Sequence, residues 1–136
     1  MNLLLDTHIL LWSLTGSDRI PSGMKTALED PSNILWLSPI SPWEILMLHE
    51  KKRIRIDHRD PVKWIKKVLT RLPFKEAPLN HEVAIQSRQV ELPHQDPADR
   101  FLVATAMVYD LTFMTMDQKI LAFDRHEICF CHDADP

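Results

Sequence analysis

The sequence predicts an α/β fold, a three-layer-like sandwich in which helices flank a mainly parallel central β-sheet. Two observations predict it: short apolar runs alternate with longer segments of helical apolar spacing, and the alternation continues along the whole chain. Continuous rather than alternating apolar runs are typical of strands that are buried on both faces, as in parallel sheets. Right-handed crossovers between such strands place helices on both faces of the sheet.

The predicted strands are short and apolar, and the predicted helices begin at a proline or at a residue that can cap a helix. The strands are 2–6, 34–38, 112–115 and 128–130, with a small extra strand or extended link at 74–78. The helices are 7–14, 21–30, 41–50, 60–72, 80–90 and 100–110, with a helical turn through 122. Two helices carry a capping-box pattern, Ser41 with Glu44 and Asp96 with Asp99.

Length and composition predict one domain that covers residues 1–136, since 45% of the residues are apolar and 26% are charged. No apolar stretch approaches the roughly 18 residues that a membrane span needs. Cys129 and Cys131 lie two apart on a predicted strand, so their side chains point to opposite faces and cannot pair. We therefore expect a protein of the reducing cytoplasm with no membrane segment.

The net charge of −3 hides a separation of charge along the chain. Residues 49–75 hold ten Lys and Arg against three acidic residues, whereas the remainder holds six against sixteen. Lys63, Lys66 and Lys67 lie on the polar face of the predicted helix 60–72. This face either binds the phosphates of a nucleic acid or is simply solvated, and the sequence does not decide between the two.

Acidic residues follow the predicted strands, where ligands bind in open parallel sheets. Asp6 ends the first strand, Glu44 follows the second, Asp117 follows the strand 112–115, and Asp99 opens the helix before that strand. Taken singly, Glu44, Asp96 and Asp117 are better explained as helix caps than as catalytic residues. Asp6 is different, because an unpaired charge beside the core is costly. Convergent carboxylates without Cys or clustered His would select Mg²⁺ or Mn²⁺.

Four motifs, in this order and spacing, resemble the PIN-domain nucleases and, among them, the VapC-type toxins of toxin–antitoxin pairs. The motifs are 4–8 (LLDTH), 38–44 (SPISPWE), 94–100 (HQDPADR) with its apolar continuation, and 111–115 leading to Asp117. The resemblance implies a metal-dependent endoribonuclease with an acidic quartet at Asp6, Glu44, Asp99 and Asp117. It also implies that Thr7 is the small hydroxyl residue beside the first acid, and that Asp96 is a cap or supporting residue.

The expected reaction is phosphodiester hydrolysis of RNA. Asp6, Asp99 and Asp117 would hold one or two Mg²⁺ or Mn²⁺ ions, with Glu44 as a further candidate ligand. Glu44 would also orient or deprotonate the attacking water, either directly or from beside the ion. Substrate contacts are expected from Thr7, Lys63, Lys66 and Lys67. The resemblance further implies a cognate antitoxin protein and a homodimer, for which an apolar surface around Trp12 is one candidate.

Other residues have plainer interpretations. The four tryptophans are expected to pack in the core, His8 to be structural, and Arg100 to bond carboxylate or carbonyl groups rather than a substrate phosphate. Two other functions remain open. One is a binding subunit that captures a basic side chain without catalysis, and the other is a phospho-acceptor domain, although Asp117 stands where such a domain needs a lysine.

Overall fold

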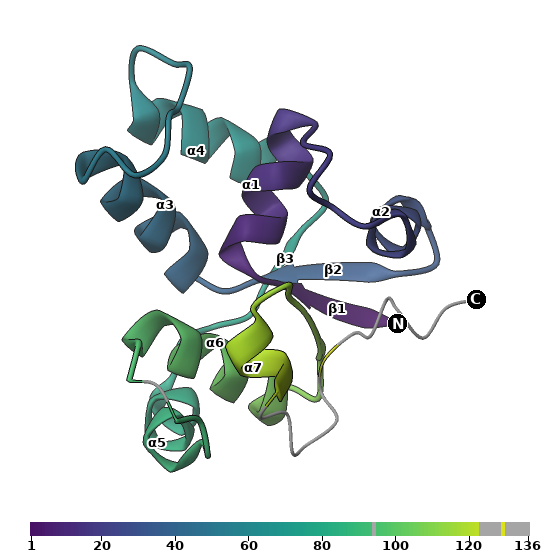
Figure 1. Cartoon of the computed structure of the whole chain (residues 1–136), viewed down its shortest axis with the longest axis vertical. Helices are drawn as coiled ribbons and strands as arrows, with labels where there is room; N and C mark the ends of the chain where they lie inside the picture. The colour runs from purple at the N-terminus through teal and green to yellow at the C-terminus, as the bar shows by residue number, and fades with distance from the viewer. Residues whose placement is uncertain (94, 123–128, 130–136) are drawn as a thin grey trace.

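A central four-stranded sheet, entirely parallel, organises the computed structural model (Figure 1). The structure describes residues 1–93, 95–122 and 129. The sheet has the order β3-β2-β1-β4 and is built from β1 (Asn2–Leu5), β2 (Ile34–Leu37), β3 (Lys75–Glu76) and β4 (Thr112–Met114). The chain adds strands outward from β1 to β3 and then returns to the other side of β1, so the strand order reverses beside β1.

Helices cover both faces of this sheet, which confirms the predicted α/β class (Figure 1). On one face lie α1 (Thr7–Thr15), α2 (Ser22–Glu29), α3 (Ile40–Glu50) and α4 (Pro61–Arg71). On the other lie α5 (His81–Gln89), α6 (Pro97–Val108) and α7 (Gln118–Ala122). None of the helices in the described part of the chain combines the length and apolarity that a membrane span requires.

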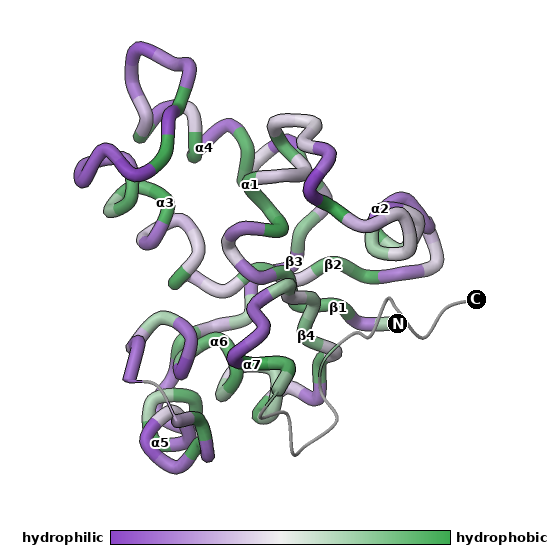
Figure 2. The backbone as a smooth tube through the Cα atoms, in the orientation of Figure 1, coloured by the Kyte–Doolittle hydropathy of each residue, from purple (hydrophilic) through white to green (hydrophobic). Residues whose placement is uncertain are grey.

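Two hydrophobic cores lie on opposite faces of the sheet because successive side chains of a strand point in opposite directions. Leu3 and Leu5 of β1 belong to the core under α1 to α4, whereas Leu4 belongs to the core under α5 to α7. All three leucines are fully buried. Figure 2 shows the hydrophobic β1 and β4 at the centre, and the hydrophilic chain between α3 and α4 at the periphery.

Local capping signals correctly predicted where several helices begin. The side chains of Asp60, Asn80 and Asp96 accept the N–H groups of Lys63, Val83 and Ala98, respectively. For α6 the cap at Asp96 was predicted correctly, but the bounds of the helix differ from the prediction. Helix α6 starts at Pro97, three residues before the predicted helix 100–110, and ends at Val108, two residues before the end of that helix.

The predicted capping box at Ser41 and Glu44 is wrong. Helix α3 begins at Ile40, and its first N–H donates to Oγ of Ser38 at 3.0 Å. Ser38 also accepts the N–H of Ser41 at its carbonyl, so the first turn closes before Ser41 can act as a cap. Ser41 is instead buried inside the helix, where its hydroxyl lies 3.1 Å from that of Thr7.

Two further expectations have partial outcomes. Trp36 and Trp64 pack against the two cores, but Trp43 is 53% exposed, so its interpretation as a packing residue is wrong. Of the predicted last strand, 128–130, only Cys129 is described, and it forms a parallel bridge with Phe113. The other two residues of that strand, and Cys131, lie outside the described residues.

Candidate active site

The four predicted acids line one pocket. It has a volume of about 400 Å³, and its lining comes from α1, α3, the first turn of α6 and the segment between β4 and α7. Figure 1 shows α1 and α3 on one side of the sheet and α6 and α7 on the other. The residues that line the pocket are Asp6, His8, Trp12, Arg19, Glu44, Asp96, Asp99, Met116 and Asp117. We call it the acidic pocket. It occupies the place where the strand order reverses, which is where open parallel sheets bind ligands.

Asp6 is held rigidly at the end of β1. Its Oδ1 accepts the N–H of Thr7 at 2.7 Å, and its Oδ2 accepts the hydroxyl of Thr115 at 2.6 Å. The residue is only 7% exposed. Burial raises the pKa of Asp6 to about 6, and the charge of Glu44 adds to this, while the Thr115 hydroxyl, the charge of His8 and the Thr7 N–H act against it. The carboxylate is therefore well positioned but costly to ionise.

Thr115 joins two of the predicted acids. Its hydroxyl donates to Asp6 and accepts the backbone N–H of Asp117 at 3.0 Å. Asp117 in turn caps α7 with its Oδ1, which accepts the N–H of Lys119 at 2.8 Å. Thr115 is fully buried, so this bridge fixes the ends of β1 and β4 relative to each other. This role was not predicted. A Thr at the end of a strand two residues before an acid is a local signal for the contact with Asp117, but not for the contact with Asp6.

Asp99 lies in the first turn of α6, where Asp96 caps the helix. The pKa of Asp99 is raised to about 8, first by burial and then by the negative charges of Asp96, Asp6, Asp117 and Glu44, in that order. Asp6, Glu44 and Asp117 come from other segments of the chain, yet each of them affects the ionisation of Asp99. Their convergence on one pocket follows directly.

Glu44 extends from α3 and is half-buried at the pocket. It does not lie in the first turn of α3, so the alternative role of a helix cap does not apply to it. Asp96 and Asp117, by contrast, do cap their helices. For Asp117 both interpretations hold together, because it caps α7 with one oxygen and also lines the pocket.

Comparisons with known proteins identify the family of this chain. The family model described as "PIN domain" matches residues 3–126. The chain belongs to the PIN domain family. The resemblance inferred from the sequence motifs is thereby confirmed at the level of the family. A comparison with curated protein sequences gave no match.

Solved structures with the same PIN fold come from bacterial complexes. A VapBC2 complex from Rickettsia felis bound to a promoter DNA fragment gives a TM-score of 0.64 at 17% identity, over 90% of this chain and 92% of that chain. FitAcB from Neisseria gonorrhoeae gives 0.64 at 20% identity, over 97% and 99%. A toxin–antitoxin complex from Klebsiella pneumoniae gives 0.62 at 20% identity, over 96% and 97%. The chain thus spans nearly the whole length of these relatives.

The donors of this PIN domain fit a hard divalent cation by their chemistry. The pocket presents five carboxylates, and oxygen donors of this kind suit Mg²⁺ or Mn²⁺. The pKa values of Asp6 and Asp99 are raised first by burial and then by the charges of neighbouring carboxylates, and a bound cation would favour the ionised form of both. In the described residues, however, no three His, Cys, Asp or Glu side chains are placed closely enough to hold one ion together. Rotation or small shifts of the carboxylates would have to accompany binding.

Other predicted substrate residues lie outside the acidic pocket. Thr7 is fully buried with its hydroxyl at Ser41, which leaves it no exposed surface for a substrate. Lys63, Lys66 and Lys67 are exposed on α4, and none of them lines the pocket. Arg100 is buried and donates to the carbonyl oxygens of Ser87, Val90 and Leu92, which confirms its structural role.

His8 differs from its structural interpretation, because it is exposed and lines the pocket. Trp12 and Arg19 also line it, and the sequence analysis assigned neither of them to the site. Among the described lining residues, Arg19 is the one Lys or Arg. It is brought there by a turn that no local sequence pattern places beside the acids.

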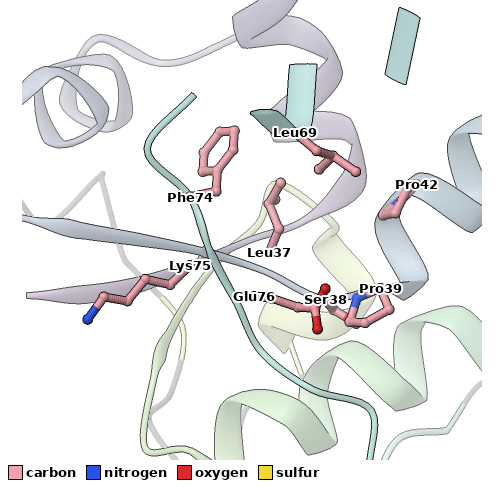
Figure 3. A pocket seen from close by; sticks show the side chains of 8 residues that line it. All are labelled: Leu37, Ser38, Pro39, Pro42, Leu69, Phe74, Lys75 and Glu76. Carbon is pink, nitrogen blue, oxygen red and sulfur yellow. The ribbon is translucent and has the colours of Figure 1, made fainter. Parts of the chain in front are cut away.

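A second, smaller pocket lies at the carboxyl end of β2, between α3 and α4 (Figure 3). Its volume is about 120 Å³, and Leu37, Leu69 and Phe74 converge on it. It contains none of the four predicted acids. Its apolar lining makes it unsuitable for the chemistry expected of the acidic pocket.

Proposed function

We propose that this PIN domain is a metal-dependent endoribonuclease and the toxin of a toxin–antitoxin pair. The observation that carries the proposal is that Asp6, Glu44, Asp99 and Asp117 line one pocket at the carboxyl edge of the sheet. A divalent ion, Mg²⁺ or Mn²⁺, would supply Lewis-acid stabilisation of the charge that develops on the phosphate oxygens.

Each acid has a distinct task in this proposal. Asp6, Asp99 and Asp117 hold the cation, with Asp6 oriented by the hydroxyl of Thr115. Glu44 faces the same pocket from the opposite helix layer and orients the attacking water or accepts its proton. Asp96 supports the site by fixing the first turn of α6.

RNA is the proposed substrate, and the basic side chains of α4 are proposed to bind its backbone. Lys63, Lys66 and Lys67 are exposed and lie on a helix that packs beside α3, which carries Glu44. Phosphate contacts of this kind give affinity without sequence selection. They would hold a strand whose scissile phosphate lies in the acidic pocket.

A cognate antitoxin and a second copy of the chain are the proposed partners. Support for the antitoxin comes from the Klebsiella pneumoniae structure, which is a toxin–antitoxin complex with the same fold.

Trp12 is half-buried, so a dimer surface is better sought at Trp43, Val62 and Leu69, which are exposed on α3 and α4. Sedimentation of the wild type and a Trp43→Ser, Leu69→Ser variant tests the dimer. We place the protein in the cytoplasm, where its RNA substrate is found.

A cleavage assay with matched variants tests the enzymatic proposal. Purified chain is incubated with single-stranded RNA in Mg²⁺, in Mn²⁺ and in EDTA. Asp6→Asn, Asp99→Asn and Glu44→Gln should each lose at least about 100-fold in rate. Asp57→Asn is the control, because Asp57 is exposed, lies outside the pocket and forms a salt bridge with the exposed Arg55.

The outcome distinguishes the two remaining functions. A binding subunit would retain affinity for its partner but show no cleavage in any ion, and this result would overturn the enzymatic proposal. Cleavage that survives in EDTA, or in Asp99→Asn, would overturn the assignment of the acids. The phospho-acceptor alternative receives no support, because the chain belongs to the PIN domain family.

A further inference from the structure

A further cavity, distinct from the pocket at β2, adjoins the acidic pocket and shares Trp12 with it. It has a volume of about 460 Å³ and lies between the C-terminal half of α1, the segment 16–21 and α2. Apolar side chains line it from Trp12, Ile20 and Leu28. Its polar and charged lining residues are Ser13, Ser17, Asp18, Ser22, Lys25 and Glu29. Cavities of about 300–1,000 Å³ with an apolar lining and a few polar groups are the usual form of small-molecule sites. We call it the α1–α2 cavity.

Trp12 belongs to the lining of both the acidic pocket and the α1–α2 cavity, and it is half-buried. The ring of His8 lies beside it, with 6.0 Å between the ring centroids. The guanidinium carbon of Arg19 lies 5.9 Å from the centroid of the Trp12 ring, within cation–π distance. An aromatic ring and a cation therefore stand together at the boundary between the two hollows.

The end of α1 explains how Arg19 reaches this place. Gly16 terminates the helix with φ of 66°, a left-handed conformation that glycine adopts without strain. The N–H groups of Gly16 and Ser17 both donate to the carbonyl of Trp12, so the chain reverses immediately. The hydroxyl of Ser17 then accepts the N–H of Arg19 at 3.1 Å, and Arg19 lies back over Trp12.

The charges make this boundary important for an RNA substrate. Five carboxylates line the acidic pocket, and they repel a phosphate unless positive charge is provided. Among the described residues that line the acidic pocket, Arg19 is the one Lys or Arg. Single-stranded RNA is commonly held by stacking its unpaired bases on aromatic side chains while Arg contacts the backbone. Trp12 and Arg19 have these two chemical properties.

We infer that the α1–α2 cavity binds one unpaired nucleobase of single-stranded RNA, with Trp12 as its stacking surface and Arg19 contacting the phosphate that leads to the acidic pocket. The inference rests on the proposed ribonuclease function and makes it more specific. It predicts a single-stranded substrate, because a base inside a duplex is stacked on its neighbours and cannot enter the cavity. The lysines of α4 would then contribute affinity at a distance from the cleaved bond.

Binding is measured by fluorescence anisotropy with labelled octauridylate and octaadenylate, in Mg²⁺ and in an Asp99→Asn background that prevents cleavage. Trp12→Ala should weaken binding about 5- to 150-fold, the equivalent of the roughly 1–3 kcal/mol of one stacked base. Trp12→Phe should retain most of the affinity. Ile85→Ala is the control, since Ile85 of α5 is 62% exposed and lines neither the acidic pocket nor the α1–α2 cavity, and it should stay within about twofold of the parent.

A base-free probe separates stacking from a structural effect of the substitution. An abasic octamer carries the same phosphates but no bases, so Trp12→Ala should not change its affinity. Arg19→Gln should weaken the binding of both probes, whereas Arg88→Gln, on the exposed surface of α5, should weaken neither. An RNA duplex of the same length should bind equally to the parent and to Trp12→Ala.

The results keep this inference distinct from the proposed function. If the wild-type chain cleaves octauridylate but Trp12→Ala binds and cleaves it normally, the base site is overturned while the ribonuclease stands. If Trp12→Ala weakens the abasic octamer as much as octauridylate, stacking is likewise overturned. If Trp12 governs octauridylate binding but no RNA is cleaved in any ion, the base site is supported and the enzymatic proposal fails.

Discussion

Replacing Asp6 by Asn should stabilise the protein at neutral pH while abolishing cleavage. Burial raises the pKa of Asp6 from 3.8 to about 6. As the pH rises through this window, the unfolded chain loses the proton before the folded chain does, so the free energy of unfolding falls. Above about pH 6 both states are ionised and the loss is complete, at roughly 3 kcal/mol. An Asn side chain does not ionise, so the Asp6→Asn variant does not lose this part of the free energy of unfolding as the pH rises.

The loss of a hydrogen bond to residue 6 opposes this stabilisation of the variant. Asn keeps an oxygen for the N–H of Thr7 but loses the acceptor for the hydroxyl of Thr115, at a cost of about 1 kcal/mol. At about pH 4.5 the ionisation penalty of the wild type is also about 1 kcal/mol, so the two proteins should be equally stable. At about pH 7.5 the variant should be more stable by about 2 kcal/mol. Reduced repulsion of Asp99 acts in the same direction.

Urea unfolding followed by tryptophan fluorescence in EDTA measures this difference at several pH values. Asp57→Asn is the control, since Asp57 is exposed and lies outside the acidic pocket. If Asp6→Asn and the wild type differ by a constant amount from about pH 4.5 to 7.5, the ionisation of Asp6 carries no penalty and the electrostatic reasoning is refuted.

Other variants test other parts of the structure, each with its own measurement. Thr115→Val should lower kcat for RNA cleavage about 10- to 100-fold with little change in KM, because it releases Asp6 and Asp117, whereas Thr112→Val should not. Arg100→Lys should cost about 3 kcal/mol in urea unfolding, since three carbonyl groups share the guanidinium, and an unchanged midpoint would contradict this. Changing Lys63, Lys66 and Lys67 together to Ala should reduce the slope of log affinity for octauridylate against log salt by about 2, and an unaltered slope would show that the α4 face is only solvated. Millimolar Mg²⁺ should raise the Tm of the wild type but not of Asp99→Asn, and equal shifts would indicate binding elsewhere.

Much of the fold was predictable because its signals are local. The strands β1, β2 and β4 follow from continuous apolar runs, since a strand buried on both faces needs apolar side chains on both. The starts of α4, α5 and α6 follow from Asp60, Asn80 and Asp96, because a side-chain cap contacts N–H groups only two or three residues away. The acids at the strand ends were also predictable, because their positions follow directly from where the apolar runs end.

The remaining features depend on contacts between distant segments. The start of α3 was mispredicted because Ser38 closes the first turn, while the hydroxyl of Ser41 contacts Thr7 from another strand end. The bond from Thr115 to Asp6 joins residues 109 positions apart, and no spacing rule reports it. The raised pKa of Asp99 likewise depends first on its burial and then on four other carboxylates, three of which come from distant segments.

By itself, then, the sequence determined which segments become strands and helices and which acids stand at the strand ends, because these depend on hydropathy and on nearest neighbours. Only the tertiary structure decided that His8, Trp12 and Arg19 share the pocket with those acids and that the lysines of α4 do not. The physical reason is that electrostatic and stacking interactions act through space, over distances that only the packing of the layers and the turn at Gly16 establish.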